Sequence, residues 1–313
     1  MLSLERVTKV YRLGAFGLQK LIAVRDVSFE IGEREIVSLI GESGSGKSTI
    51  GKLILRLTPI TSGTIRFEGT DVSTLNGLSL KEYYRRVQGV FQDPFASFNP
   101  IFKADRVFRM VRDEFYPQVG MREWNEKVEG ALRAVGLNPP DVLNKFPHQL
   151  SGGQLQRFLV ARALLLDIRL LIADEIISML DASTRVDVLN LLADLKARGL
   201  SILFITHDLS LGYYISERAI ILYRGRIAEM GPTDKIYNRP LHPYTEMLME
   251  SVPRLDRKWE EEGRIERKAA LTGSVPGGCV YADRCPKAMD ICTREEPELK
   301  EAETGHFVAC WAR

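Results

Sequence analysis

The stretch that decides the fold is Gly41-Glu42-Ser43-Gly44-Ser45-Gly46-Lys47-Ser48-Thr49, which fits the pattern G-x-x-x-x-G-K-[ST] at every position. Residues 36–40, Ile-Val-Ser-Leu-Ile, form an apolar run typical of a strand, and a helical pattern of apolar residues begins at Ile50. This strand–loop–helix order is the context in which the pattern binds phosphate. Glycines let backbone N–H groups turn toward the phosphates, and the helix N-terminus adds partial positive charge.

The residue types in this loop predict a site for a nucleoside triphosphate and Mg²⁺. We expect Lys47 to reach the β- and γ-phosphates and the Ser48 hydroxyl to bind Mg²⁺. The predicted phosphate-binding residues are Gly41, Ser43, Gly44, Gly46, Lys47, Ser48 and Thr49. A glycine- and serine-rich loop that fits the pattern by chance is the alternative, and the flanking strand and helix argue against it.

Composition excludes few classes of protein. The chain has 313 residues, of which 45% are hydrophobic and 27% charged, as in ordinary globular proteins. Its length allows about two domains. The net charge of +2 gives no electrostatic sign of nucleic-acid binding. The N-terminus lacks the layout of a signal peptide, and no run approaches about 20 apolar residues. We therefore expect a soluble, cytosolic chain that meets a membrane only through a partner.

The order of the predicted elements indicates an α/β fold. Short strands fill residues 1–35 and 63–67, and residues 79–166 are mainly helical, with an interruption at Pro139-Pro140. Later strands are predicted at 170–173, 201–205, 219–223 and 226–230, and helices at 183–197 and 209–216. Strands that alternate with helices are typical of a largely parallel sheet covered on both faces. A charged run at 254–268 predicts a solvated linker before a short tail.

Two carboxylates, Asp174 and Glu175, follow the apolar run at 170–173. In an enzyme with a phosphate loop, we expect Asp174 to hold Mg²⁺ through water. Glu175 would then polarise the attacking water as general base. Acidic pairs after strands are common by chance, but the distance from the phosphate loop and the order of the strands favour the functional interpretation.

Residues 150–157, Leu-Ser-Gly-Gly-Gln-Leu-Gln-Arg, open another predicted helix. Ser151 is a natural N-cap, so capping alone would explain its presence. The glycine pair followed by a glutamine also fits a second phosphate-binding helix N-terminus, in which Ser151, Gly153 and Gln154 would bind ATP. This string resembles the LSGGQ signature of ATP-binding cassette (ABC) ATPases.

The resemblance covers roughly residues 1–245 and implies roles for further residues. Tyr11 would stack on adenine. Gln92 would touch Mg²⁺ and the attacking water and sense a membrane partner, and His207 would be the switch histidine. Residues 178–181 match the D-loop. The implied catalytic residues are Glu175, His207 and Gln92, and the implied Mg²⁺ ligands are Ser48, Gln92 and Asp174.

The same resemblance implies a P-loop NTPase fold with an N-terminal antiparallel β subdomain. A helical signature subdomain is expected at about 80–166 and a small extension at the C-terminus. We therefore predict an ABC ATPase domain at 1–250 and a C-terminal extension at 251–313. Ile176-Ile177 stand where the family usually has Pro and a small residue, which leaves the shape of that loop open.

A chain with one phosphate loop and one signature implies a partner. In the family, the nucleotide is sandwiched between the phosphate loop of one subunit and the signature of another. We therefore expect a homologous or identical ATPase subunit arranged head to tail, two transmembrane permease subunits, an extracytoplasmic solute-binding protein, and no nucleic acid. ATP would close the dimer and drive alternating access in the membrane subunits. This places the chain peripherally on the cytoplasmic face of the membrane.

The four cysteines, Cys279, Cys285, Cys292 and Cys310, all lie near the C-terminus. A cytosolic chain argues against disulfides, and the spacings exceed the about two to four residues typical of zinc sites. The tail, with residues 241–245 and 92–100, resembles the C-terminal extension of oligopeptide/dipeptide importer ATPases. Some members carry a four-iron four-sulfur cluster there, which we predict here. Zinc or free thiols are the alternatives. His306 is close enough in the sequence to substitute as a ligand, although a position on the surface or behind the ligands is favoured over that role.

The resemblance to this subfamily predicts import of oligopeptides or dipeptides. Related members also carry nickel chelates, opines or oligosaccharides, and oligosaccharides are the main alternative cargo. The ATPase subunit does not touch the solute, so the sequence leaves the cargo open. An exporter subunit and a soluble ABC ATPase of DNA repair or translation are the other classes. The latter usually has long coiled-coil insertions, two cassettes in one chain or basic arms, and we find none of these in the sequence.

Overall fold

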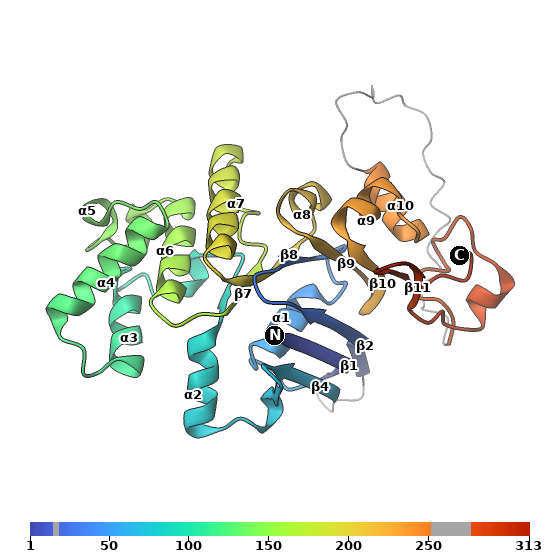
Figure 1. Cartoon of the computed structure of the whole chain (residues 1–313), viewed down its shortest axis with the longest axis horizontal. Coiled ribbons are helices and arrows are strands. Elements are labelled where there is room, and N and C mark those ends of the chain that lie inside the picture. Colours follow the sequence, from blue (N-terminus) through green and yellow to red (C-terminus); the bar gives the residue numbers. More distant parts are fainter. Residues whose placement is uncertain (15–18, 252–276) are drawn as a thin grey trace.

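The structure is a computed structural model that describes residues 1–14, 19–251 and 277–313 (Figure 1). The charged run at 254–268 and the turn residue Gly17 lie outside the described residues. Two sheets and the helices around them make up the described part of the chain.

The smaller sheet is antiparallel and contains the N-terminal strands. Its order is β2-β1-β4-β5, with β1 at Leu2–Leu13, β2 at Gln19–Ile31, β4 at Ser62–Phe67 and β5 at Thr70–Asp71. Both β2 and β4 pair with β1 in antiparallel register. The predicted N-terminal antiparallel subdomain is therefore confirmed.

The larger sheet has eight strands in the order β11-β12-β10-β9-β3-β8-β7-β6. Its parallel part consists of β6 (Val87–Val90), β7 (Leu170–Asp174), β8 (Ser201–Thr206), β3 (Ile36–Ile40) and β9 (Arg218–Tyr223). The antiparallel strands are β10 (Arg226–Pro232), β12 (His306–Val308) and β11 (Lys300–Glu303). The C-terminal residues thus extend the same sheet as the phosphate-loop strand.

The helical segment expected at 79–166 contains one strand that the sequence analysis missed. Residues Val-Gln-Gly-Val form β6, which pairs in parallel with β7. Four residues are too short to show a period of their own, and Gln88-Gly89 interrupt the apolar pattern. The expectation of helix at this point was therefore wrong, because pairing with β7 determines the conformation.

The helices lie along the larger sheet and beyond one end of it (Figure 1). They are α1 (Lys47–Ile54), α2 (Gly77–Arg86), α3 (Arg106–Phe115), α4 (Met121–Ala134), α5 (Pro139–Val142), α6 (Gly152–Leu164), α7 (Ala182–Ala197), α8 (Leu209–Ile215), α9 (Thr233–Asn238) and α10 (Pro243–Glu250). Short 3₁₀ turns lie at Val72–Thr74, Phe95–Ser97, Pro147–Gln149 and Asp290–Thr293. Helices α3 to α6 form a group of their own, drawn in green (Figure 1).

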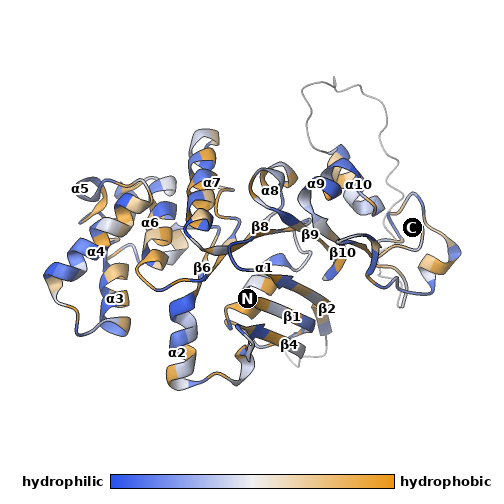
Figure 2. Ribbon diagram, viewed as in Figure 1, coloured by the Kyte–Doolittle hydropathy of each residue, from blue (hydrophilic) through white to orange (hydrophobic). Residues whose placement is uncertain are grey.

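Hydrophobic side chains pack against both faces of the central strands. Every residue of β3, β7 and β8 is buried, and hydrophobic colour runs along the middle of the sheet (Figure 2). Ile202 and Phe204 of β8 pack in the cluster with the helical group, whereas Leu203 and Ile205 pack with α1 and the N-terminal sheet. This alternation follows from the two-residue period of a strand.

Within the described residues, we find no helix with the length and apolar content needed to span a bilayer.

Candidate nucleotide-binding site

The predicted site residues meet at one edge of the larger sheet. The phosphate loop follows β3, Gln92 follows β6, Asp174 ends β7, and His207 follows β8. These four strands are neighbours and parallel, so their carboxyl ends lie at the same edge. Ligands of open α/β sheets bind outside the carboxyl ends of the strands.

The phosphate loop is held in a shape that only glycine permits at two positions. Gly44 and Gly46 have φ angles of +80° and +106°. A Cβ atom at Gly46 would lie 2.3 Å from the carbonyl oxygen of Ala23, on β2. Gly46 is also the N-cap of α1 and offers no side chain to cap it. The first N–H groups of α1 are therefore left for an anion.

Lys47 is buried and points back at its own loop. Its ammonium Nζ donates to the carbonyl oxygens of Gly41, at 2.7 Å, and Glu42, at 3.0 Å. Burial lowers the pKa of Lys47, while the carboxylates of Glu175 and Asp174 act in the opposite direction. The loop therefore provides a positive charge at the position where phosphate oxygens would lie.

Ser48 and Asp174 form a pair of oxygen ligands. The Ser48 hydroxyl donates to Oδ1 of Asp174 over 3.1 Å. Burial raises the pKa of Asp174, and the hydrogen bond from Ser48 opposes that shift. Hydroxyl and carboxylate oxygens are the ligands that Mg²⁺ prefers, so the residues present fit this ion.

Glu175 lies beside His207. The His207 Nδ1 atom is 3.3 Å from Oε1 of Glu175. The backbone of Glu175 is left-handed, with φ +51°, and its N–H donates to the carbonyl oxygen of Ile205. Such a conformation costs about 1 to 3 kcal/mol and persists where the surroundings fix it. The two side chains predicted to act in hydrolysis are thus brought together.

The unusual Ile176-Ile177 pair is part of the core. Both side chains are almost fully buried, at 1% and 2% exposed. They belong to the hydrophobic cluster that also contains the buried side chains of helices α3 to α6. The chain then turns, with the Ser178 N–H bonded to the Glu175 carbonyl oxygen. Burial of two large apolar side chains therefore anchors the loop that follows Glu175.

Tyr11 lies on the N-terminal hairpin next to the phosphate loop. It pairs with Leu21 of β2, two residues before Ala23, whose carbonyl oxygen borders Gly46 and Gly225. The Lys9 ammonium lies 4.9 Å from the centre of the Tyr11 ring. The pairing of β1 with β2 therefore positions the Tyr11 ring on the strand pair that contacts the phosphate loop.

Glu42 receives contacts from the C-terminal third of the chain, which no pattern in the sequence predicted. The Tyr244 hydroxyl accepts from the Glu42 N–H at 2.9 Å. The Arg284 guanidinium donates to both carboxylate oxygens of Glu42, at 2.8 and 3.1 Å. No local pattern could have revealed contacts between residues more than 200 positions apart.

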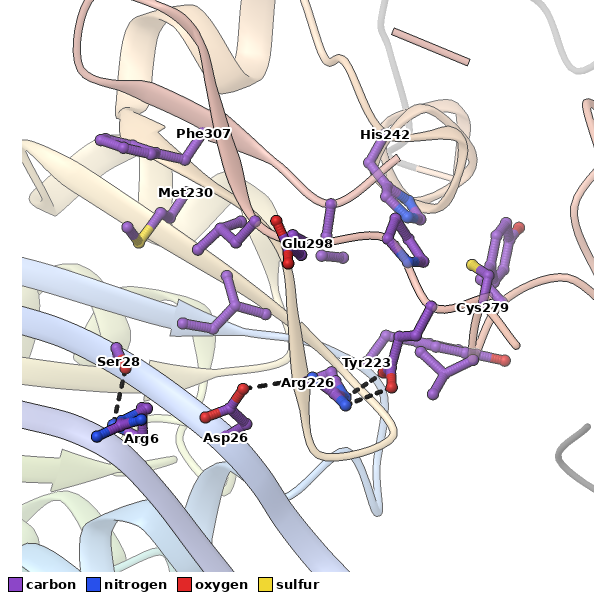
Figure 3. A pocket seen from close by; sticks show the side chains of 18 residues that line it. Arg6, Asp26, Ser28, Tyr223, Arg226, Met230, His242, Cys279, Glu298 and Phe307 are labelled. Carbon is purple, nitrogen blue, oxygen red and sulfur yellow. Dashed lines mark hydrogen bonds and ion pairs between the residues drawn. The ribbon is translucent and has the colours of Figure 1, made fainter. Parts of the chain in front are cut away.

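A pocket of about 510 Å³ lies apart from this site, between the N-terminal strands, β10 and the C-terminal region (Figure 3). Arg226 lies in its wall and pairs with Glu296 and, at 4.0 Å, with Asp26. Cys279 and His242 line it as well. None of its lining residues belongs to the phosphate loop.

Comparisons with known proteins agree with the geometry. The family described as ABC transporter matches residues 24–178, and the family described as oligopeptide/dipeptide transporter, C-terminal region, matches residues 228–292. A putative peptide import ATP-binding protein of Brucella ovis is 42% identical over 99% of this chain and 97% of its own length. The oligopeptide transport ATP-binding protein AppF of Bacillus subtilis is 41% identical over 99% and 96%. The chain belongs to the ATP-binding subunits of ABC transporters.

Solved structures of ABC cassettes resemble this subunit. The ATP-binding cassette MJ0796, in a dimeric post-hydrolysis state bound to ADP and Pi, matches with a TM-score of 0.67 and 29% identity. The match covers 74% of this chain and 99% of that one. The fold is therefore that of an ABC ATPase, and the chain is an ATP-hydrolysing enzyme of this type.

The signature of this ABC ATPase opens α6, in the helical group. Ser151 is its N-cap: its hydroxyl accepts from the Gln154 N–H at 3.2 Å, and the Gln154 side chain accepts from the Ser151 N–H at 2.9 Å. Gly153 packs against α7, since a Cβ there would lie 2.5 Å from Cγ2 of Thr184. Among the described residues, we find no hydrogen bond between Ser151, Gly153 or Gln154 and the phosphate loop.

The cysteine region of this ABC ATPase is tied to its body by buried polar contacts. His306 is buried and lies 2.7 Å from Oε1 of the equally buried Glu229. The expected surface position of His306 was therefore wrong, because β12 carries this side chain into the core. Its role as a ligand, or behind the ligands, stays a prediction. The described residues contain no group of three or more His, Cys, Asp or Glu arranged to hold a metal ion.

Proposed function

We propose that this subunit supplies the energy for an importer of oligopeptides or dipeptides. The observation that carries the proposal is the combined match of both segments, 24–178 to ABC transporters and 228–292 to the C-terminal region of oligopeptide/dipeptide transporters. Relatives that align over nearly their whole length are named for peptide import and oligopeptide transport. The oligosaccharide alternative has no comparable support.

The residues at the sheet edge have distinct roles in this proposal. Lys47 and the N–H groups of the phosphate loop would bind the phosphates, and Ser48, Gln92 and Asp174 would hold Mg²⁺. When bound, Mg²⁺ neutralises charge on the β- and γ-phosphate oxygens. Glu175 takes a proton from the attacking water, and His207, 3.3 Å from it, orients its carboxylate. Tyr11 stacks on the adenine.

The site needs a second subunit in this proposal. Ser151, Gly153 and Gln154 would bind the nucleotide of a head-to-tail partner, a homologue or a second copy. The dimeric state of the similar cassette MJ0796 supports this arrangement. The remaining partners are two permease subunits and an extracytoplasmic solute-binding protein, which places the chain on the cytoplasmic face of the membrane. In this proposal, residues 1–250 form the ATPase domain and residues 251–313 a C-terminal extension.

We also propose that Cys279, Cys285, Cys292 and Cys310 hold a four-iron four-sulfur cluster. Burial and, to a smaller extent, the charges of the other three thiols raise the pKa of Cys279 to about 11. Thiols that affect one another in this way lie in one neighbourhood. Four thiolates are the usual ligand set of such a cluster. Iron and acid-labile sulfide assays on anaerobically purified protein test this, and zinc or neither element contradicts it.

The peptide proposal is tested on the complete assembly. The subunit is reconstituted with its permeases and binding protein in vesicles, and phosphate release is measured with a peptide pool and, separately, an oligosaccharide pool. We expect peptides alone to stimulate hydrolysis. Stimulation by oligosaccharides alone would contradict the cargo and leave the mechanism intact. Failure of the subunit to associate with permeases would contradict the transporter role itself.

A further inference from the structure

Glu42 is bound through three different groups. Its N–H donates to the Tyr244 hydroxyl at 2.9 Å, and its carbonyl oxygen accepts from the Lys47 ammonium at 3.0 Å. Its carboxylate receives two hydrogen bonds from Arg284. One residue of the phosphate loop therefore connects the phosphate-binding lysine with the C-terminal region.

Arg284 stands on a rigid platform. Its guanidinium lies 5.9 Å from the ring centres of both Tyr223 and Tyr281. These two rings meet at 5.1 Å, edge to face, and Tyr244 lies 4.6 Å from Tyr223. All three tyrosines are at most 2% exposed. Packed aromatic rings have few alternative rotamers, so the platform fixes where Arg284 can place its charge.

The negative charge of the Glu42 carboxylate is close enough to Lys47 to affect its pKa. It is one of three carboxylates that oppose the burial-induced fall in the pKa of Lys47, with Glu175 and Asp174. Without a partner, its negative charge would repel the phosphates of an incoming nucleotide. Arg284 faces this charge with two hydrogen bonds in the planar geometry that a carboxylate prefers.

We propose that Arg284 is a positioning residue for ATP binding: it neutralises and holds Glu42, so that the C-terminal cysteine region sets the affinity of the phosphate loop for ATP. The proposal rests on the assigned ATPase function and concerns the same site. Arg284 directly precedes Cys285, and Tyr281 lies two residues after Cys279. The fold of the cysteine region is thereby coupled to the nucleotide site.

The competing interpretation is that the pair only docks the C-terminal region on the body. Other ion pairs perform that task away from the phosphate loop. Arg239, which follows α9, donates to both carboxylate oxygens of Glu303 on β11, at 3.0 and 3.1 Å. It has the same residue types as the Arg284–Glu42 pair, although a single nitrogen of Arg239, Nη2, bonds both oxygens, whereas Arg284 uses Nη1 and Nη2. Arg239→Ala is therefore the matched control.

The test measures equilibrium binding of ATP and steady-state hydrolysis on the full-length subunit. The variants are Arg284→Ala, Arg284→Lys, Glu42→Gln, the double variant Arg284→Ala/Glu42→Gln, and Arg239→Ala. For Arg284→Ala we expect the Kd for ATP to rise about three- to tenfold at low salt, with kcat changed less than about twofold. The effect should shrink at high salt, because screening weakens the repulsion.

The double variant distinguishes two effects of losing Arg284: the unneutralised charge of Glu42, and the lost attachment of the C-terminal region to the body. Glu42→Gln removes the repelling carboxylate, so the double variant should bind ATP nearly as well as wild type, and Arg284→Lys should lie between wild type and Arg284→Ala. An unchanged Kd in Arg284→Ala, a loss that Glu42→Gln does not rescue, or an equal loss in Arg239→Ala would overturn the proposal. Wild-type protein that binds no ATP would instead overturn the assigned function.

Discussion

The Ser48 hydroxyl donates a hydrogen bond to Oδ1 of Asp174 over 3.1 Å, although the two residues are 126 positions apart in the sequence. Ser48 is in the first turn of α1, and Asp174 ends β7. The sheet order places β8 between β3 and β7, so the carboxyl end of β7 lies within reach of the helix that follows β3. This contact turns two separate motifs into one site.

We expect Glu175→Gln to abolish turnover while ATP binding persists. Gln keeps the shape of the side chain but cannot accept the proton of the attacking water, and loss of a general base costs about 10² to 10⁴ in rate. Phosphate release measures the turnover, and size-exclusion chromatography with ATP should show a stable dimer. Steady-state hydrolysis near the wild-type rate would remove Glu175 from the role of base.

The variant Lys47→Ala should weaken nucleotide binding itself. It removes the ammonium that donates to the Gly41 and Glu42 carbonyl oxygens and that is placed to meet phosphates. Loss of one charged hydrogen-bond donor costs about 1.5 to 3 kcal/mol, which is about 10- to 150-fold in Kd. The matched control is Lys52→Ala on the exposed side of the same helix. Equal binding by both variants would exclude the assigned role of Lys47.

We predict that Gly153→Ala impairs hydrolysis by the dimer and leaves ATP binding by the subunit intact. The new Cβ would lie 2.5 Å from Cγ2 of Thr184, so α6 must shift against α7. Thr184→Ser removes this methyl group and keeps a hydroxyl for the hydrogen bond to Asp181. The double variant should therefore recover part of the activity. If it recovers none, the contact with Thr184 is not the cause of the defect.

Acid should destabilise the protein through His242. Burial lowers the pKa of His242 to about 4, although Glu229 and Glu246 act in the opposite direction. Because the unfolded chain binds its proton near pH 6.5, the stability contributed by neutral His242 is complete above about pH 6.5. It is lost as the pH falls toward about 4, by about 1.4 kcal/mol per pH unit.

Denaturant unfolding at a series of pH values measures this effect. His242 accepts from the Tyr244 N–H and so caps α10. In His242→Asn the amide oxygen can take over the cap, since Asn is a favoured N-cap, but it does not titrate. The free energy of unfolding of this variant should depend less on pH between about 4 and 6.5. The exposed His148→Asn is the control, and equal slopes in all three proteins would contradict the prediction.

Most strands and helices could be predicted, because their apolar periods are strong. The buried runs at 36–40, 170–173 and 201–205 became β3, β7 and β8, and the helix expected at 183–197 became α7. The exceptions are helices α9 and α10 and the strands β5, β6, β11 and β12, which have two to four residues each. Strands this short have no period of their own, and pairing with a neighbouring strand creates them.

The sequence by itself determined the chemistry of this protein. Residue type and spacing were enough to predict the roles of Gly44, Gly46, Lys47, Ser48, Asp174 and Glu175. Phosphate binding and proton transfer each need particular chemical groups, and these groups can be recognised in the sequence. Only the tertiary structure decided which distant residues control that chemistry. Arg284 reaches Glu42 across more than 200 positions, and His306 is buried against Glu229. Contacts of this kind depend on how strands are ordered in the sheet, which no local pattern of residues encodes.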